Sequence, residues 1–416
     1  MKLYFQLIIL LIISVHNIAS QELENKIILL KVYPLEFDLY INKLVQKPIS
    51  NRANIREYII PVNTDSLFIR SSGYRDKYIF FDNSHDTSVL EIKLEQMETS
   101  LIYEAIFPTG SQPKSVEFSK DGKYLAVALL NGSGVEIFSL GNMELYKSLQ
   151  PPAKWSKKKG FVETVFFATR NELWVSQMTT GMIHVFNTDT WKYKLSFDCG
   201  GSWPKVITLN NSEDTAYVSN WTSKNISVIN TLDYSVIKTI SVNGIPRGMD
   251  ISPDEKYIYV GNFTSGDINK IDIEKNILIK NIDLGDGALR HLVISNKNKK
   301  LYVSDMLHGT ISVLNLNTDS VIKTFYAGSN INTIKLSPDG KKLFISSRGH
   351  NNENGYLQKG PDFGKIFIYD TDAKIITDWT WGGNQPTGLA VSPFGNLLAF
   401  SDFLDHRIEI YKIQPD

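Results

Sequence analysis

One unit of sequence recurs seven times between about residue 113 and the end of the chain, and this repeat constrains the fold more than any other feature. The clearest copy, residues 245–284, reads GIPRGMDISPDEKYIYVGNFTSGDINKIDIEKNILIKNIDL. Its apolar or alternating runs are separated by a Pro-Asp turn, a Ser-Gly turn and a charged turn, which predicts four short antiparallel strands. Four such strands make one blade of a β-propeller, an architecture that hosts binding, scaffolding and catalysis alike.

The copies are regularly spaced except at two places. The residues that end the first strands serve as landmarks, and they are Ser119, Ala168, Asn210, Ser252, Ser295, Ser337 and Ser392. Successive landmarks lie 49, 42, 42, 43, 42 and 55 residues apart, whereas a four-stranded blade takes about 40–45 residues. The two long steps contain the insertions 151–160 and 348–364. Long loops on a rigid scaffold often carry function.

The second strands of the copies share a short motif, seen in Tyr217-Val-Ser-Asn220 and Tyr302-Val-Ser-Asp305. Its β-branched and aromatic residues suit a half-buried pleated surface. The motif resembles the YVTN family of β-propeller repeats, and the match covers about three-quarters of the chain. Proteins that look like this are commonly extracytoplasmic, so the resemblance implies a place outside the cytoplasm.

The last copy ends after its third strand, at residues 407–413. Because an open ring leaves two exposed edges, we expect residues 100–107, SLIYEAIF, to add the missing fourth strand. The predicted fold is therefore all-β, with a seven-bladed propeller over residues 99–414. The alternative makes residues 65–107 an eighth blade, closed by residues 57–62.

Residues 22–98 are expected to form a separate small β-sandwich. A strand, the turn Ser72-Gly73-Tyr74, another strand, a polar turn and a third strand follow one another in its second half. This order is similar to PEGA-type or related Ig-like domains. The propeller would then be preceded by a compact domain that acts as a spacer or a second contact surface.

The N-terminus and the overall composition indicate where the protein works. Lys2 is followed by the apolar run 7–13 and a polar stretch at 16–20, so residues 1–20 have the layout of a secretory signal peptide. No later segment is apolar for long enough to cross a membrane, so we expect an extracytoplasmic protein, periplasmic or secreted.

The 44 basic and 44 acidic residues balance, which argues against nucleic acid as a partner. Cys199 is the only cysteine, which excludes an internal disulfide and favours a buried thiol.

A propeller brings together the loops that enter its first strands and those that leave its second strands, on one face above the central channel. The entering residues are predicted to be Lys114, Glu163, Lys205, Arg247, Arg290, Asn332 and Thr387. The candidate ligand-binding residues on this face are Lys114, Lys205, Arg247, Arg290, His291, Asn220, Asn262, Asp305, Arg348, His350, Asp402, Trp155 and Trp221. A concave charged opening focuses the electric field. We therefore expect an anionic or polar partner, such as a carboxylated small molecule, a glycan or an acidic protein segment. In the alternative, these residues form a solvated rim in which Asp305 and Asp402 pair with the arginines.

The sequence contains no clear motif for metal binding or catalysis at this face. His291, His308, His350 and His406 could join Asp305 and Asp402 around a metal, but no ligand spacing supports a metal site or a cofactor. Catalytic motifs for nucleophilic serine, zinc-dependent or phosphate-binding chemistry are missing from the sequence. We therefore predict a non-enzymatic binding or scaffold protein. The alternative is a propeller enzyme similar to lactonases or to the propeller subunits of quinoprotein dehydrogenases, for which Glu163, His291, Asp305 and Asp402 are candidates.

Overall fold

The computed structural model describes residues 25–41, 44–52, 54–64, 66–71, 74, 77–81, 89–96 and 100–414. The signal peptide predicted at residues 1–20 lies outside these ranges, as do Ser72 and Gly73. The chain divides into two compact units, Met1–Met97 and Glu98–Asp416. Among the described residues, no helix is long and apolar enough to span a bilayer.

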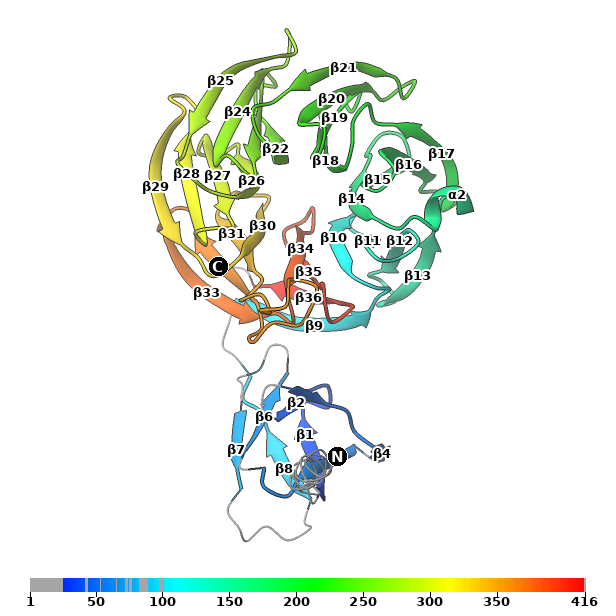
Figure 1. Cartoon of the computed structure of the whole chain (residues 1–416), viewed down its shortest axis with the longest axis vertical. Coiled ribbons are helices and arrows are strands. Elements are labelled where there is room, and N and C mark those ends of the chain that lie inside the picture. Colours follow the sequence, from blue (N-terminus) through cyan, green and yellow to red (C-terminus); the bar gives the residue numbers. More distant parts are fainter. Residues whose placement is uncertain are drawn as a thin grey trace, which may run out of the picture. The chain divides into compact units, whose positions relative to one another are not determined.

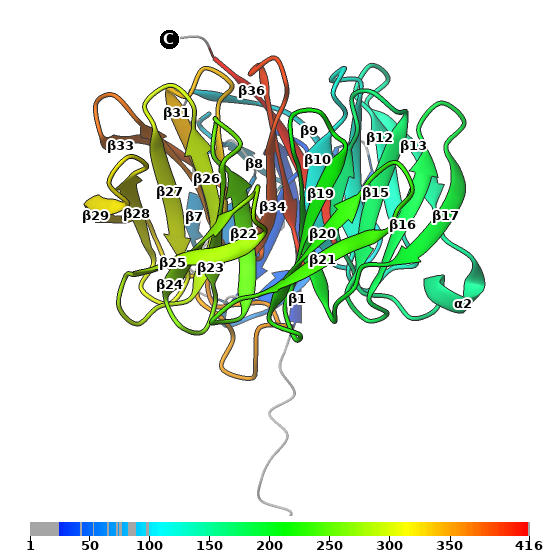
Figure 2. The same ribbon diagram turned by 90° about the horizontal axis from the view of Figure 1, so that it is seen from above.

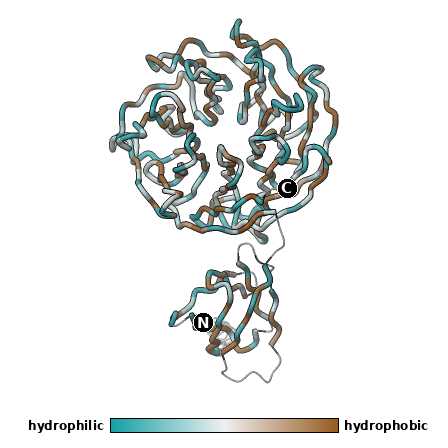
Figure 3. Tube along the Cα trace, turned by 180° about the vertical axis from the view of Figure 1, so that it is seen from behind, coloured by the Kyte–Doolittle hydropathy of each residue, from teal (hydrophilic) through white to brown (hydrophobic). Residues whose placement is uncertain are grey.

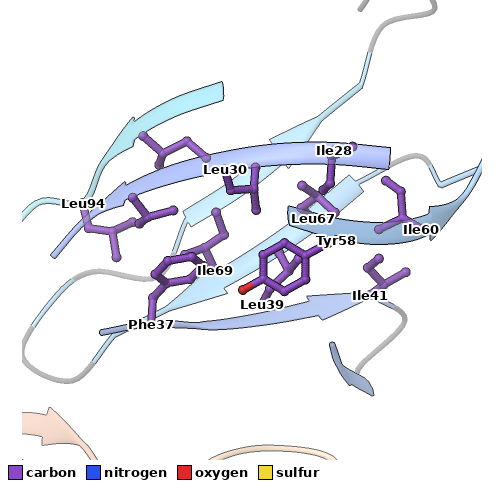
Figure 4. Close-up of a cluster of buried hydrophobic side chains, with 12 residues drawn as sticks. Ile28, Leu30, Phe37, Leu39, Ile41, Tyr58, Ile60, Leu67, Ile69 and Leu94 are labelled. Carbon is purple, nitrogen blue, oxygen red and sulfur yellow. The ribbon is translucent and has the colours of Figure 1, made fainter. Parts of the chain in front are cut away.

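The N-terminal unit contains two four-stranded sheets that share one core. The first sheet has the order β4-β5-β1-β8, made of Ser50–Arg52, Ile55–Pro61, Asn25–Tyr33 and Leu90–Lys93. The second has the order β3-β2-β6-β7, made of Leu44–Gln46, Asp38–Ile41, Ser66–Arg70 and Lys77–Phe80. Alternate residues of both sheets, among them Leu30, Leu39 and Ile69, form the buried cluster in Figure 4. Strands β6, β7 and β8 therefore belong to the sheets of this unit and do not form an eighth blade.

The C-terminal unit is a ring of seven four-stranded sheets (Figure 1). The inner strands surround the ring centre and are β10 (Pro113–Phe118), β14 (Phe161–Phe166), β18 (Pro204–Leu209), β22 (Pro246–Ile251), β26 (Leu289–Ser295), β30 (Ile331–Leu336) and β34 (Pro386–Val391). The second strands are β11 (Tyr124–Leu129), β15 (Glu172–Gln177), β19 (Thr215–Asn220), β23 (Tyr257–Asn262), β27 (Lys300–Asp305), β31 (Lys342–Ser347) and β35 (Leu397–Asp402). The fold is the seven-bladed propeller that the repeat predicts.

The third and fourth strands complete each blade toward the outside (Figure 2). The third strands are β12 (Val135–Ser139), β16 (Met182–Asn187), β20 (Asn225–Asn230), β24 (Asp267–Asp272), β28 (Thr310–Asn315), β32 (Lys365–Asp370) and β36 (Arg407–Ile413). The fourth strands are β13 (Glu144–Leu149), β17 (Lys192–Asp198), β21 (Val236–Ser241), β25 (Ile277–Asp283), β29 (Ser320–Tyr326) and β33 (Ile375–Trp381). One short helix, α2 (Ala153–Ser156), lies at the outer edge in both views.

The seventh blade takes its fourth strand from the start of the propeller unit. Strand β9 (Leu101–Pro108) pairs antiparallel with β36, from Leu101 opposite Ile413 to Pro108 opposite Arg407. The inner strands β10 and β34 also contact each other. The strand predicted at residues 100–107 is therefore in the expected sheet, and it joins the two ends of the unit.

The core of the propeller lies between neighbouring blades. One cluster combines Tyr217 and Val228 of the third blade with Met249 and Val260 of the fourth. Similar clusters join the other neighbours. Hydrophobic and hydrophilic stretches both occur around the whole ring in Figure 3. Second strands such as β19 and β23 are buried along nearly their whole length, because neighbouring blades pack on both faces of each sheet. The stability of such a repeat comes mainly from contacts between adjacent units.

Candidate functional site

Every inner strand has an irregularity near its start. In β10 the pairing with β11 shifts between Pro113 and Ser115, and the same shift follows the first paired residue of the other six inner strands. A β-bulge bends a strand and re-aims its side chains. We call the residue after the first paired residue the bulge position. It holds Lys114, Val162, Lys205, Arg247, Arg290, Asn332 and Thr387.

The second blade corrects one prediction of the sequence analysis. Phe161 pairs with Gln177, so the bulge position is Val162, and Glu163 lies one residue further along β14. In the fifth blade the residue equivalent to Glu163 is His291. The offset escaped the sequence analysis because four inner strands begin with proline, whereas β14 begins with phenylalanine after the insertion 151–160.

The serine of the repeat motif fixes the backbone at the bulges. Ser219 Oγ accepts a hydrogen bond from Val206 N–H at 3.1 Å and donates one to the carbonyl oxygen of Arg247, in the next blade, at 2.9 Å. The motif serine therefore holds the residue from which a neighbouring basic side chain projects. Equivalent bonds join Ser176 to the Lys205 carbonyl and Ser304 to the Asn332 carbonyl, both at 2.9 Å.

Five basic side chains interact where the bulge positions meet, and we call them the central cationic cluster: Lys114, Lys205, Arg247, Arg290 and Arg348. Lys205, Arg247, Arg290 and Arg348 are only 8%, 5%, 9% and 4% exposed, and Lys114 is partly buried. Burial first, and then the charges of the four other members, lower the pKa of Lys114 well below its usual value. Burial, Arg247 and Arg290 together lower the pKa of Lys205 to about 6.

The cluster is incompletely paired. Arg290 Nε donates to Asn332 Oδ1 at 2.5 Å, and Arg348 donates to Gln385 Oε1. Arg247 Nε and Nη1 and Arg348 Nε are buried without a hydrogen-bond acceptor. Within the described residues, no member of the cluster forms an ion pair with a carboxylate. Buried charges in proteins are normally paired, so this arrangement is suited to an anion from outside.

Glu163 and His291 lie beside the cluster and are influenced by its charge. Burial raises the pKa of Glu163, although Arg247 and Lys335 act in the opposite direction. Burial, followed by Lys335 and the two arginines, lowers the pKa of His291 well below its usual value, so the ring is neutral at pH 7. His291 Nδ1 is buried without a partner. A neutral imidazole or a carboxyl group beside cations can act as a general base or acid.

The sequence analysis missed Lys335, which influences both Glu163 and His291. It is the fourth residue after Ile331, the first paired residue of β30. Asp250 and Glu117 occupy the same position in β22 and β10, and Asp250 Oδ2 accepts a hydrogen bond from Ile294 N–H at 2.8 Å. The signal that could have found these residues is the two-residue period of a strand, counted from the bulge.

Apolar side chains follow the second strands and lie next to the cluster. The Trp221 and Phe263 rings are 4.8 Å apart at 44°. Lys205 Nζ lies 5.5 Å from the Trp221 ring centre and 3.0 Å from Met178 Sδ, while Lys114 Nζ lies 4.7 Å from the Phe403 ring centre. The position after the second strand is otherwise held by Leu130, Met306 and Arg348. Arg348 is thus the one charged residue at an otherwise apolar position of the repeat.

Four predicted site residues instead form bonds within their own blades. Asn220 Nδ2 donates to Ser227 Oγ at 2.8 Å, and Asn262 Nδ2 donates to Asn269 Oδ1 at 3.0 Å. Asp305 Oδ1 accepts from Ala288 N–H at 2.9 Å, and Asp402 Oδ1 accepts from Gly383 N–H at 2.8 Å. The two asparagines thus join their second strands to the third strands, and the two aspartates anchor the loops before the inner strands. The acids do not pair with the arginines of the cluster, because Asp305 contacts His308 and Asp402 contacts Arg407.

The two long insertions contribute unequally to the site. Trp155, on α2, lies with its ring 5.6 Å from that of His184 on a third strand, at the outer edge of the ring. His350 is exposed and contacts Asp362 and Ser329 at 3.0 Å each. Arg348 begins the second insertion and joins the cluster, where its guanidinium lies 5.7 Å from the Tyr356 ring centre. The first insertion therefore supplies no side chain to the cluster.

The structure does not gather the histidines around a metal. His308 Nδ1 contacts Asp305 Oδ2 at 2.6 Å, and His406 Nδ1 accepts a hydrogen bond from Gln112 N–H at 3.0 Å. In the part of the chain that the structure describes, no group of three or more His, Cys, Asp or Glu side chains is placed to hold a metal ion.

The chain is similar to one protein family and to two individual proteins. Residues 275–416 match a family described as a lactonase with a seven-bladed beta-propeller. Antigen Lp49 of Leptospira interrogans is 37% identical over 368 residues, which cover 86% of this chain and 80% of that protein. The 6-phosphogluconolactonase of Formosa agariphila is 25% identical over 282 residues, which cover 57% of this chain and 76% of that protein.

A solved structure shares the fold. The hydrazine synthase of Kuenenia stuttgartiensis superimposes with a TM-score of 0.64 at 17% sequence identity, over 74% of this chain and 98% of that one. At this identity the likeness concerns the propeller fold alone.

Proposed function

We propose, for a chain that belongs to the same family as antigen Lp49 of Leptospira interrogans, that it is an exported binding protein whose propeller recognises an anionic partner through the central cationic cluster. Export is supported by the signal-peptide layout of residues 1–20. Sequencing of the mature N-terminus tests this part. A chain that keeps Met1 in the envelope or culture fluid would contradict it.

The incomplete pairing of the cluster is the observation that carries the proposal. Arg247 is 5% exposed and leaves Nε and Nη1 without an acceptor, in the company of four other basic side chains. A buried donor without a partner costs about 1–3 kcal/mol, and the mutual repulsion of the cations adds to this. Bound anionic oxygens would remove both costs. Such destabilising arrangements are typical of binding sites rather than of residues kept for stability.

The test replaces Arg247 and Arg290 together by alanine and measures citrate and inorganic phosphate binding by calorimetry. We expect the affinity for citrate to fall by at least about tenfold for each arginine, since a hydrogen bond to a charged group contributes about 1.5–3 kcal/mol. The melting temperature should stay the same or rise, because two repelling buried charges are removed. The control is Lys147→Ala with Lys238→Ala, two exposed lysines on the outer strands β13 and β21. Equal citrate affinity of the double arginine variant and the unaltered protein would contradict the proposal.

A second candidate function is the hydrolysis of an anionic lactone. Two observations favour it: Glu163 and His291 adjoin the cluster, and the chain is similar to a 6-phosphogluconolactonase and to a lactonase family. The family match at 275–416 includes Arg290, His291 and Arg348 but not Glu163. Either proton acceptor would activate a water molecule, while the cations would hold the substrate anion and stabilise the developing oxyanion.

This candidate is tested by following acid release from 6-phosphogluconolactone in a weakly buffered solution. We expect hydrolysis above the spontaneous rate, lost in Glu163→Gln or in His291→Gln, with phosphate binding retained in both variants. Acid release at the spontaneous rate by the unaltered protein would remove the enzymatic reading and leave the binding function.

A further inference from the structure

We infer that the ligand of the central cationic cluster is a small molecule with two separate anionic groups joined by a flat, largely apolar segment. This inference rests on the proposed function and names the ligand class for the same site. It excludes a glycan chain and an acidic protein surface as the principal partner.

The burial of the cluster limits the size of the group that reaches it. Four of its five side chains are less than a tenth exposed. A folded protein or a branched glycan would meet mainly the exposed outer residues, such as Trp203 and Tyr356. A carboxylate or phosphate group of a small molecule is small enough to approach a side chain as buried as Arg247.

The hydrogen-bond donors without partners fall into two sets. Arg247 Nε and Nη1 belong to β22. Arg348 Nε follows β31, and Asn332 Nδ2 belongs to β30 in the same blade. Strand β26 lies between β22 and β30, and its Arg290 is already bonded to Asn332. The two sets lie on strands separated by β26, and we take each set to bind an anionic group of its own.

On the side of the third and fourth blades, the ligand segment attached to the anionic group at Arg247 would meet aromatic surface. The tilted pair of Trp221 and Phe263 follows the second strands of the third and fourth blades, which also supply Lys205 and Arg247. Lys205 Nζ lies 5.4 Å and 5.5 Å from the Trp203 and Trp221 ring centres. Aromatic faces favour a flat ligand segment, and cations beside them favour anionic substituents at its ends.

The protonation of Lys205 on binding gives a second, independent measurement of the ligand's charge. With its pKa lowered to about 6, Lys205 is mostly neutral at pH 7.5 in the free protein. A bound dianion favours the charged ammonium and raises this pKa, so binding takes up a proton. Affinity should therefore be highest at or below pH 6 and fall as the pH rises above 6, until the pKa of the bound state is reached.

The experiment compares matched probes by titration calorimetry on the full chain at pH 7.5, in two buffers with different ionisation enthalpies. Terephthalate carries two carboxylates on a flat ring, and benzoate carries one. A third probe, 4-carboxyphenyl phosphate, distinguishes a phosphate ester from a dicarboxylate, and a hexaglutamate peptide represents an acidic protein segment. We expect terephthalate or the phosphate ester to bind at least about tenfold more tightly than benzoate. The heats should differ between the two buffers because a proton is taken up.

Two variants locate the anionic groups. Arg247→Met and Arg348→Met keep the apolar stem of the side chain and remove its charge. Each should reduce terephthalate affinity to about that of benzoate, and Lys147→Ala with Lys238→Ala should leave it unchanged. If a methionine variant does not fold by circular dichroism, the corresponding lysine variant replaces it, with a smaller expected loss because the forked guanidinium is removed.

The possible failures are distinguishable. Equal binding of benzoate and terephthalate, with both weakened in the Arg247 variant, overturns this inference and leaves the proposed function standing. Tighter binding of hexaglutamate than of terephthalate overturns it in favour of a peptide partner. If none of the anions binds, the proposed function itself is wrong.

Discussion

At the scale of the residue, two polar positions of the repeat serve different purposes. In four blades the residue that ends the second strand is Asn220, Asn262, Asp305 or Asp402, and each binds its own blade. The bulge position, by contrast, holds Lys205, Arg247 and Arg290, whose positive charges act on one another at the ring centre. Both positions are polar in the sequence, so residue type alone cannot separate them. Only the strand register shows which side chains meet at the ring centre.

A buried acid pair in the seventh blade gives a prediction at this scale. Asp402 and Glu409 are fully buried, and Arg407 lies 2.8 Å from Asp402 Oδ2 and 2.9 Å from Glu409 Oε1. Burial, and then the charge of Glu409, raise the pKa of Asp402 well above its usual value. In the unfolded chain an aspartate ionises near pH 4. The stability that comes from the raised pKa is fully present at low pH and is lost as the pH rises through the folded pKa.

Asp402→Asn, which imitates the protonated acid, should therefore gain stability relative to the unaltered protein as the pH rises. Urea denaturation at pH 5 and pH 8 measures the two free energies of unfolding. We expect the free energy of unfolding of the variant, relative to that of the unaltered protein, to be higher at pH 8 than at pH 5. A difference between the two proteins that is the same at both pH values would show that the pair carries no extra proton.

At the scale of the element, strand β9 gives the sharpest prediction. Leu101 is 2% exposed and packs in the cluster with Phe344 and Tyr411, while its neighbour Ile102 is 37% exposed. Leu101→Ala should lower the free energy of unfolding by about 2–5 kcal/mol, as expected for a large-to-small change in a core. The matched control Ile102→Ala, on the same strand, should change it by less than about 0.5 kcal/mol. Equal effects in thermal or denaturant unfolding would show that β9 does not hold the ring.

The elements themselves were largely predictable from the sequence. Pro-Asp turns and apolar alternation mark the strands of the propeller, and the missing last strand pointed to residues 100–107. The bulges could not be predicted, because a one-residue shift leaves the hydrophobic alternation intact on either side of it. For this reason Glu163 was assigned to the position of Val162, and Lys335 was missed. The unpaired state of Arg247 is a tertiary property, because its basic neighbours come from other blades of the ring.

At the scale of the whole molecule, the cluster belongs entirely to one unit. Its members come from the first, third, fourth, fifth and sixth blades, so no single repeat contains the site. A closed set of blades is needed to bring Lys114 near Arg348, which are separated by more than half of the chain. Basic residues that differ between the repeats are therefore brought together at one charged centre. The N-terminal unit has its own core around Leu30 and Ile69.

Separate cores predict that residues 98–416 fold and bind anions without the N-terminal unit. This shortened chain keeps β9, all five members of the cluster and every cluster of buried residues in the propeller. Calorimetry should show one unfolding transition for it and two for the longer chain, because each unit buries its own apolar side chains. Its affinity for citrate should agree with that of the longer chain within about twofold, since no described residue before 98 takes part in the cluster. A folded residue 98–416 chain with greatly weakened citrate binding would place part of the binding site in the N-terminal unit.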